Sequence, residues 1–552
     1  LYSGRIEGDA EIPLQGDNAG HVDFNWHAIN LGQFITDVAR LPVTLRGTLA
    51  GKLHIGVPAG KLAEVMAWNV DASFDTSPLV ARAQRLGELH GRLTYGNRQV
   101  DYRLNGELLR GTLELAGRWQ PSPPPQANAV NEGHFQWTDA RLEALTPLLA
   151  AQRTLDSLTG LVSINLRYRH DEQTGTPTGA GDLKIDGVRL NGEPLFDELR
   201  GIIRLAADRL EVTNADATLA GGALTASGYA FLDPRRRGLF RITVGNADIA
   251  QLLAPWPKSG SQMRGVIDAQ LEGFFGGGRP MVVTGTMAMS RGRAGGIEFD
   301  SLRVPVHGTI DPASGRGTFE LHGITGQIAH GRLTGDFDVA LASGLGLNGR
   351  GKFAKIDLRT LLQESGSTSR LASGKITGNY TLGGRNVRTP NDLTGTFDAT
   401  LRDTQAMSLP IFERALPYLT GGVSGSTTFD DGTVRGSLAR GVIRVDRFSL
   451  SSGSAQIFAQ GNVTLAGRLD LNVTVNTGQL NVPRRTLSLL ASRILLVAAP
   501  PIGLLVNVTQ FLSNQVINLE VTGTVRSPTI RIRPLNLLGQ EAAQFFLLQA
   551  LP

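Results

Sequence analysis

The sequence predicts a mainly β protein: an elongated β-sheet built from repeats and curled into an open trough, with short helices between the repeats. An apolar helical segment is expected near the C-terminus. The first observation behind this prediction is strict alternation of apolar and polar residues, as in LDLNVTV over residues 469–475. Side chains of a strand point alternately to its two faces, so each such stretch has one apolar and one polar face. The second observation is that one structural unit recurs along the chain.

The recurring unit is clearest in residues 222–253. A short alternating strand and a turn lead into a second strand, in which Phe240, Ile242 and Val244 share one face. The period then changes, because Asp248 is a typical helix-start residue and apolar residues follow it at helical spacing. The unit is therefore strand, turn, strand and short helix.

Two landmarks of this unit recur with the same period. The opening glycine returns at intervals of 107, 111 and 109 residues, at Gly4, Gly111, Gly222 and Gly331. The start of the short helix returns at intervals of 111, 107 and 109 residues, at Leu31, Leu142, Ile249 and Leu358. Two independent landmarks with one period indicate a repeat architecture, and a fifth copy starts near Ser454. Residues 1–482 are therefore predicted to be tandem β repeats of about 110 residues that form a hydrophobic groove.

Residues 26–41, 142–158 and 409–419 are predicted to be helical, with strands between them. The C-terminal part, residues 483–552, is expected to differ. Residues 483–516 are very apolar and predict a helical hairpin, but Arg493, Asn507 and the break at Pro500-Pro501 make this segment a poor membrane-spanning helix. Closing strands are expected at 519–525 and 529–533, followed by a terminal amphipathic helix over 537–551.

The composition excludes several classes of function. Lys and Arg number 54 against 49 Asp and Glu, and the resulting net charge of +5 is small for 552 residues. The basic residues are scattered singly over polar strand positions, which indicates solvation and not nucleic-acid binding. The absence of cysteine excludes disulfides, thiolate metal sites and a cysteine nucleophile. The chain begins Leu-Tyr-Ser within a strand pattern, so we expect it to be a fragment that lacks an N-terminal segment.

No catalytic residue, cofactor or metal site is predicted, and we do not expect an enzyme. Residues 344–349 match GxGxxG, but strand pattern surrounds them and the helix that would receive a phosphate is missing. Residues 346–352 match GxxxxGK, but Phe353 stands where a magnesium-binding Ser or Thr is required. His322 and His330 are the closest candidates for a metal-ligating pair, and they lack an acidic residue in register.

One strand face is apolar in every repeat. Mid-sized Val, Ile, Leu and Ala predominate on it, which suits a smooth apolar lining, although a closed β-sandwich core could use the same residues. The residues predicted to line this face are Val162, Ile164, Leu166, Phe240, Ile242, Val244, Ile267, Ala269, Leu271, Phe337, Val339, Leu341, Leu469, Leu471, Val473 and Val475.

Three segments carry a resemblance to a known family: residues 441–450 (GVIRVDRFSL), 461–473 (GNVTLAGRLDLNV) and 521–532 (VTGTVRSPTIRI). Their strand and glycine spacing resembles the C-terminal pattern of the AsmA-like superfamily of bacterial envelope proteins, which includes the YhdP and TamB groups. The likeness extends more weakly over the whole chain.

The resemblance implies a bridge that spans the periplasm of a Gram-negative-type bacterium and is anchored in the inner membrane by a segment absent from this chain. Such a bridge conducts phospholipids between the inner and outer membranes and supports outer-membrane homeostasis. The sixteen apolar residues would then line the lipid-binding groove, and the partners would be phospholipids, the two membranes and, as an open alternative, an outer-membrane protein. A charge at Ile242 or Val473 should block transport, whereas Thr243→Asp and Thr474→Asp on the opposite face should be tolerated.

Three other functions fit the same pattern. The sheet could be a scaffold for the insertion of outer-membrane proteins, with an exposed edge strand that pairs with a client strand. It could be a passive β-solenoid adhesin with a filled interior. A carbohydrate-active enzyme is disfavoured, because no strand face gathers carboxylates.

Overall fold

A computed structural model represents the 552-residue chain. It describes residues 2–12, 18–35, 45–81, 84–120, 129–144, 158–171, 176–233, 235–255, 263–294, 297–311, 314–342, 344–364, 373–405, 428–452, 455–476, 516–525, 527–533 and 540–549.

Strands make up most of the described chain, so the mainly β prediction is confirmed. In chain order they are β1 (Arg5–Glu11), β2 (Gly20–Asn30), β3 (Leu45–Arg46), β4 (Thr48–Val57), β5 (Asn69–Thr76), β6 (Leu79–Ala81), β7 (Gln84–Gly87), β8 (Leu89–Gly96), β9 (Gln99–Leu108), β10 (Gly111–Gln120), β11 (Val130–Arg141), β12 (Leu158–Asp171), β13 (Thr176–Leu190), β14 (Glu193–Ala206), β15 (Arg209–Leu219), β16 (Gly222–Phe231), β17 (Arg237–Asp248), β18 (Met263–Gly276), β19 (Met281–Ala294), β20 (Ile297–Ile310), β21 (Gly317–Ile328), β22 (Gly331–Leu341), β23 (Leu345–Asp357), β24 (Ser373–Val387), β25 (Thr394–Gln405), β26 (Thr428–Ala439), β27 (Val442–Ser451), β28 (Gln456–Thr464), β29 (Arg468–Asn476), β30 (Val516–Thr524) and β31 (Pro528–Arg533). The helical elements are α1 (Leu31–Phe34), η2 (Val65–Ala67), α3 (Ile249–Leu252), α5 (Leu358–Glu364), η4 (Pro390–Asp392) and α9 (Gln540–Gln549). Among these helices, none has the length and apolar character needed to cross a membrane.

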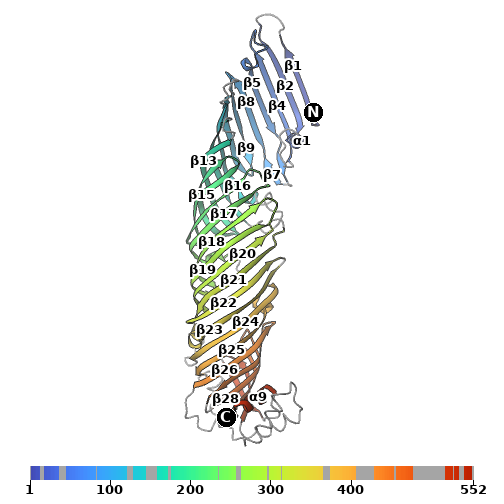
Figure 1. Ribbon diagram of the computed structural model, residues 1–552. Helices are drawn as coiled ribbons and strands as arrows, with labels where there is room; N and C mark the ends of the chain where they lie inside the picture. The colour runs from blue at the N-terminus through green and yellow to red at the C-terminus, as the bar shows by residue number, and fades with distance from the viewer. Residues whose placement is uncertain are drawn as a thin grey trace. The chain divides into compact units, whose positions relative to one another are not determined.

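Twenty-eight strands belong to one antiparallel sheet, and β3, β6 and β7 form a small three-stranded sheet. The chain divides into two units, Leu1–Ser261 with Ile267–Gly285 and Thr309–Arg316, and Gln262–Val266 with Thr286–Gly308 and Gly317–Pro552. In the first unit each large-sheet strand from β1 to β17 pairs with the next one along the chain (Figure 1). In the second unit β21 to β31 pair in the same way. Among the described strands, β1 and β31 are paired on one side only, so the sheet is not closed.

Similar backbone geometry occurs at four places near the end of a long strand. One residue there adopts a left-handed conformation, with φ between +56° and +57°, at Ala28, Asp139, Asn246 and Lys355. Two residues further on, a backbone N–H donates to a carbonyl in the turn that opens the preceding strand, as Asp248 N does to Ala220 O at 2.9 Å and Asp357 N to Ala329 O at 2.9 Å. The Asp248 carboxylate then accepts the N–H groups of the first turn of α3, so the strand ends in a capped helix.

The short helices that the structure describes lie at the predicted places, but the first begins later than predicted. β2 continues to Asn30, and α1 begins only at Leu31, so the expectation of helix from residue 26 is wrong. The bulge at Ala28 turns the strand without ending its pairing with β4, which resumes at Ile29. α9 lies within the predicted range 537–551. Residues 145–157, 406–427 and 477–515 are outside the described part, and with them the central part of the second predicted helix, the helix at 409–419 and nearly all of the apolar hairpin.

Buried side chains gather in separate clusters. In the first unit Leu31, Leu79 and Leu109 form a cluster against which Phe34 of α1 packs. In the second unit, one cluster lies around Ile328 and Ile356 with Leu361 of α5 against it. A larger one lies on β26 to β30, where Phe429, Leu450, Ile457, Leu519 and Val521 are at most 1% exposed. The sheet therefore has a fully buried core at β26 to β30.

Thr474 does not lie on a solvated face, as the alternation predicted. It is 6% exposed and lies opposite Phe458, whose ring is 5.9 Å from that of Phe545 in α9. Helix α9 thus packs on the side of β28 that alternation alone makes polar, and Phe546 is fully buried there as well. The expected tolerance of Thr474→Asp is therefore corrected.

We expect Thr474→Asp to lower the free energy of unfolding by about 3 kcal/mol, because a carboxylate would be buried without a cation beside it. The matched substitution Thr243→Asp, at a strand position that is only half-buried, should cost less than about 1 kcal/mol. Urea unfolding followed by circular dichroism measures both values. Equal costs would contradict the packing of α9 over Thr474.

Candidate functional site

The strand register of the first unit places apolar residues in one continuous cross-strand row. Each member lies directly opposite the next on the neighbouring strand, and none is polar. From β1 to β17 the row reads Ile6, Trp26, Gly51, Phe74, Gly91, Leu104, Leu115, Phe135, Leu166, Gly181, Ile203, Val212, Gly228 and Phe240. We call the side of the sheet that carries such rows the apolar face, and the other side the polar face.

The second unit has a row of the same kind. From β21 to β31 it reads Leu321, Phe337, Gly349, Leu382, Gly395, Leu438, Ile443, Val463, Leu469, Gly523 and Pro528. A one-residue slip would place a polar residue in this row at most of its positions, because side chains alternate between the faces. Both units therefore keep their register over many strands in the way that an unbroken apolar face requires.

All sixteen residues predicted to line this face lie on the same side of their strands. On β18 the alternation is fixed by Glu272, which pairs with Arg241 on the polar face and so places Leu271 on the side of Phe240. Buried members are Val162, Leu166, Val244, Ala269, Leu469, Val473 and Val475, half-buried members are Ile164, Phe240, Ile242, Ile267, Leu271, Phe337, Val339 and Leu471, and Leu341 is exposed. Val473 and Val475 belong to the closed core at β26 to β30, so they are not a free lining.

Elsewhere the apolar face stays partly open. Leu93 and Leu341 are each 38% exposed and Leu345 is 37% exposed, although their strand neighbours on that face are apolar. A β-sandwich core would bury such side chains against a second sheet. The described residues supply no second sheet over these positions.

Aromatic rings on the apolar face lie over glycines of the neighbouring strand. A Cβ on Gly91 would overlap the Phe74 ring, and one on Gly349 would overlap Phe337. The same arrangement joins Gly51 to Trp26, Gly117 to Tyr102, Gly351 to Tyr380 and Gly436 to Phe397. Because the rings fill the space that side chains of the next strand would occupy, the face has low relief despite its aromatic residues.

Comparison of the chain with protein-family models, with curated proteins and with solved structures finds no match.

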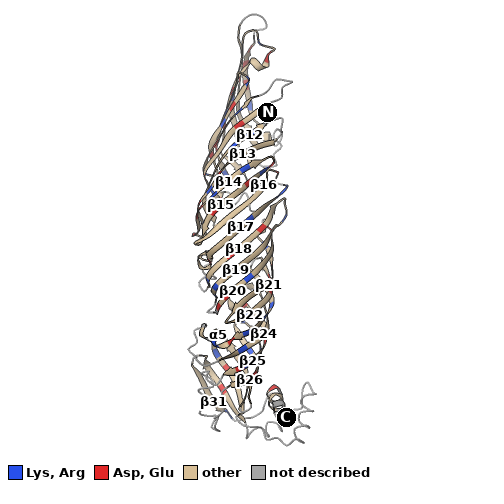
Figure 2. Ribbon diagram, turned by 60° about the vertical axis from the view of Figure 1, so that its left-hand side comes forward, with Lys and Arg blue, Asp and Glu red and all other residues tan. Residues whose placement is uncertain are grey.

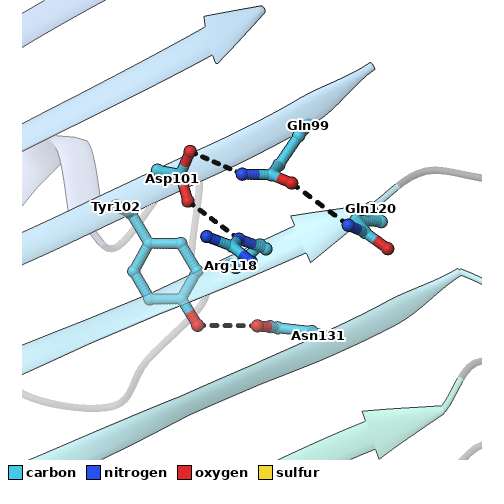
Figure 3. Close-up of polar contacts among 6 residues, drawn as sticks. All are labelled: Gln99, Asp101, Tyr102, Arg118, Gln120 and Asn131. Atoms are coloured by element: carbon cyan, nitrogen blue, oxygen red, sulfur yellow. Dashed lines mark hydrogen bonds and ion pairs between the residues drawn. The ribbon is translucent and has the colours of Figure 1, made fainter. Parts of the chain in front are cut away.

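Three polar side chains on the apolar face of the first unit, those of Tyr102, Asn131 and Tyr168, are hydrogen-bonded to one another. The Tyr102 hydroxyl donates to Asn131 Oδ1 at 2.6 Å (Figure 3) and lies 2.5 Å from the Tyr168 hydroxyl. Burial, followed by the hydrogen bond that the Tyr168 hydroxyl donates to Tyr102, raises the pKa of Tyr168 well above its usual value of 10.0. The pairing leaves these hydroxyls satisfied without a charged partner.

The raised pKa of Tyr168 makes stability depend on alkaline pH. A folded-state pKa above the unfolded value contributes stability that is present below about pH 10 and is lost as the pH rises further. We therefore expect the urea midpoint to fall above about pH 10, and to fall less steeply in Tyr168→Phe. An identical slope in both proteins would contradict the burial of this hydroxyl.

The polar face carries short local networks of opposite charge. Asp101 accepts from Gln99 at 2.8 Å and from Arg118 at 3.2 Å, and these bonds lower the pKa of Asp101 (Figure 3). Beside this network lies a hollow of about 970 Å³ that is lined by Arg103, His134 and Arg167 among others. Acidic and basic residues are interspersed over the strands (Figure 2), as on an ordinary solvated surface.

An aromatic and arginine-rich cluster lies where β16, β17, β18 and β19 turn. Leu232, Phe274 and Phe275 are 59%, 45% and 36% exposed. The Arg236 guanidinium lies 3.4 Å from the centre of the Phe231 ring, and that of Arg237 lies 5.5 Å from the centre of Phe274. Phe275 continues the apolar face, since its ring is 6.4 Å from Phe240. We call these residues the aromatic rim. Sequence patterning missed it because it joins two turns about 40 residues apart, although the run Arg235 to Arg237 next to Leu232 was a visible signal.

His322 has an acidic neighbour, so the expectation that it lacks one is wrong. His322 Nε2 lies 3.1 Å from Asp338 Oδ1 on the polar face, whereas His330 occupies a left-handed turn position between β21 and β22.

Proposed function

We propose that this chain binds phospholipids along its apolar face and conducts them between two membranes. The observation that carries the proposal is the pair of unbroken apolar rows, each of which continues from strand to strand without a polar interruption. An enzyme needs polar groups that converge at one place, whereas a conduit needs similar apolar contacts with the lipid at every position along it.

The physical chemistry of acyl chains fits such rows. Neighbouring strands are about 4.8 Å apart, so a chain lying along a row passes from one strand to the next every three to four methylenes. Each methylene removed from water contributes about 0.8 kcal/mol. Because successive strands offer similar apolar contacts and low relief, neighbouring positions differ little in energy, and a lipid moves along the face without a deep trap. The aromatic rim supplies arginines beside exposed rings, which suits the phosphate and the glycerol region of a lipid at the border of the face.

The finer architecture belongs to the same proposal. We take the sheet to be a repeat-built trough, supported by the four left-handed residues near strand ends, which recur at intervals of 111, 107 and 109 residues. Location in the periplasm and anchoring in the inner membrane rest on the resemblance to AsmA-like envelope proteins, as does delivery to the outer membrane.

Site-specific photocrosslinking in cells tests the proposal. A photoreactive residue at Ile164 or Val339 places the probe on the apolar face, and the neighbours Asn165 and Ala340 place it on the polar face. We expect phospholipid adducts at the first pair and none at the second. Equal labelling of the two faces, or labelling of neither, would refute a lipid-binding apolar face.

A scaffold for strand insertion is the second candidate, because β1 is exposed at every residue and, within the described part of the chain, pairs with β2 alone. A client strand could add to its free edge. Crosslinks from β1 to an outer-membrane protein, with no lipid adducts at Ile164, would favour this function over the first.

A further inference from the structure

Two aspartates and two histidines gather on the polar face of β1, β2 and β4, three neighbouring strands (Figure 1). His21 Nε2 lies 3.8 Å from Asp9 Oδ2 and 3.8 Å from Asp23 Oδ2. His54 Nδ1 lies 2.8 Å from the other oxygen of Asp23, Oδ1. The ligand atoms of Asp9, His21 and Asp23 all lie within 4.8 Å of one another.

The register makes this cluster unfavourable without a cation. Asp9 lies directly opposite Asp23 in the β1–β2 pair, and like charges in that position repel. One strand further along the same row, Asp71 is paired with Arg92 at 2.6 Å. Asp9 and Asp23, by contrast, form ion pairs only with histidines among the described residues. An imidazole, unlike a guanidinium, carries no fixed positive charge at neutral pH.

We infer that Asp9, His21 and Asp23 form a Zn²⁺ site. One imidazole and two carboxylates are ligands that zinc accepts, and bonds of about 2.0–2.2 Å would need His21 Nε2 to approach each carboxylate oxygen by about half an ångström. Water completes the tetrahedron. His54 is a positioning residue: it donates to Asp23 Oδ1 and so leaves Oδ2 directed at the metal, as a hydrogen-bonded ligand carboxylate usually is.

The site would fasten the edge of the sheet. Asp9 belongs to β1, whereas His21 and Asp23 belong to β2, so a bound ion links the two strands through their side chains. Among the strands that the structure describes, β2 is the one backbone partner of β1, and the seven residues of β1 are all exposed. Metal binding therefore adds stability where the sheet has least of its own.

Calorimetric titration of the chelator-treated full chain with ZnCl₂ at pH 7.5 tests the inference. We expect one ion per chain. Asp9→Asn and His21→Ala should abolish binding, and His54→Phe should weaken it about tenfold through loss of the positioning hydrogen bond. The control is His90→Ala, since His90 also bonds an aspartate, Asp75 at 2.6 Å, but without a second carboxylate; its affinity should equal that of the wild type.

Hydrogen exchange supplies a readout that does not depend on the calorimeter. Zinc should slow the exchange of β1 amides in the wild type and in His90→Ala, and leave Asp9→Asn unchanged. Asp9 is 77% exposed, so its replacement does not threaten folding. Absence of a zinc isotherm, or an equal loss of affinity in His90→Ala and His21→Ala, would overturn the site. The site does not depend on lipid conduction, and either can fail alone.

Discussion

Ile242→Asp is expected to stop lipid movement along the apolar face, whereas Thr243→Asp, one residue further, should leave it intact. Ile242 lies opposite Ala226 on the apolar face, and Thr243 lies opposite Thr225 on the polar face. Aspartate is too short for its carboxylate to reach water around the edge of the sheet, as a lysine could. A carboxylate beside an acyl chain raises the energy of that position by about 3 kcal/mol, which slows passage about 100-fold.

The measurement is the amount of phospholipid that co-purifies with each variant, together with transfer between donor and acceptor vesicles. Val339→Asp and Ala340→Asp repeat the comparison in the second unit, on two faces of β22. Circular dichroism and the urea midpoint establish that the variants are folded. Equal transfer rates for the aspartate variants of both faces would show that the apolar face does not conduct lipid.

Gly222→Ala should be far more destabilising than Gly221→Ala, although the two glycines are adjacent. A Cβ on Gly222 would lie within 2.6 Å of three backbone atoms of residues 245–247, so β16 and β17 would have to separate. Gly221 has φ +76°, and beyond its two chain neighbours no atom lies within 4 Å of a Cβ placed on it. A side chain there is therefore destabilising only because the backbone conformation is left-handed. The losses in unfolding free energy should be about 3 kcal/mol or more for Gly222→Ala and about 1 kcal/mol for Gly221→Ala.

Urea unfolding of the two variants provides this comparison. Arg110 and His330, which precede Gly111 and Gly331 as Gly221 precedes Gly222, have φ values of +62°, so ordinary side chains occupy the corresponding turn position. If Gly221→Ala were the costlier change, the close approach of β16 to β17 would not be what selects glycine at residue 222.

Alternation was sufficient to assign the faces of most strands, because the side-chain period of two follows from the pleat itself. Ile164 and Val339 were assigned in this way without knowledge of their partners. The register was not predictable, since it depends on which residue of the next strand lies opposite, and bulges such as that at Ala28 shift it locally. The glycines under Phe74 and Phe337 therefore looked like punctuation in the sequence, and only the pairing places them beneath rings.

Two errors have the same physical origin. Thr474 follows the alternation, but α9 is about 70 residues away in sequence, and its packing on β28 reverses the exposure that the strand alone would give. The first helix was predicted to begin at Trp26 because its apolar residues satisfy both periods, and the pairing of Trp26 with Gly51 decides for the strand. The cluster of Asp9, His21 and Asp23 was also invisible, because it depends on the register of β1 with β2.

The pairing of each strand with its successor has a consequence for how the chain is made. In both units a newly synthesised strand finds its partner in the hairpin just completed, so folding advances by short loop closures and does not wait for distant segments. The strand that has paired last offers its free edge to the next strand of the chain, and more distant strands are not its partners. For the same reason, a hairpin could be gained or lost by duplication or deletion while every other pairing is kept. The length of such a sheet can therefore change by whole hairpins while the pairing pattern stays the same, and selection could match that length to the distance between two surfaces.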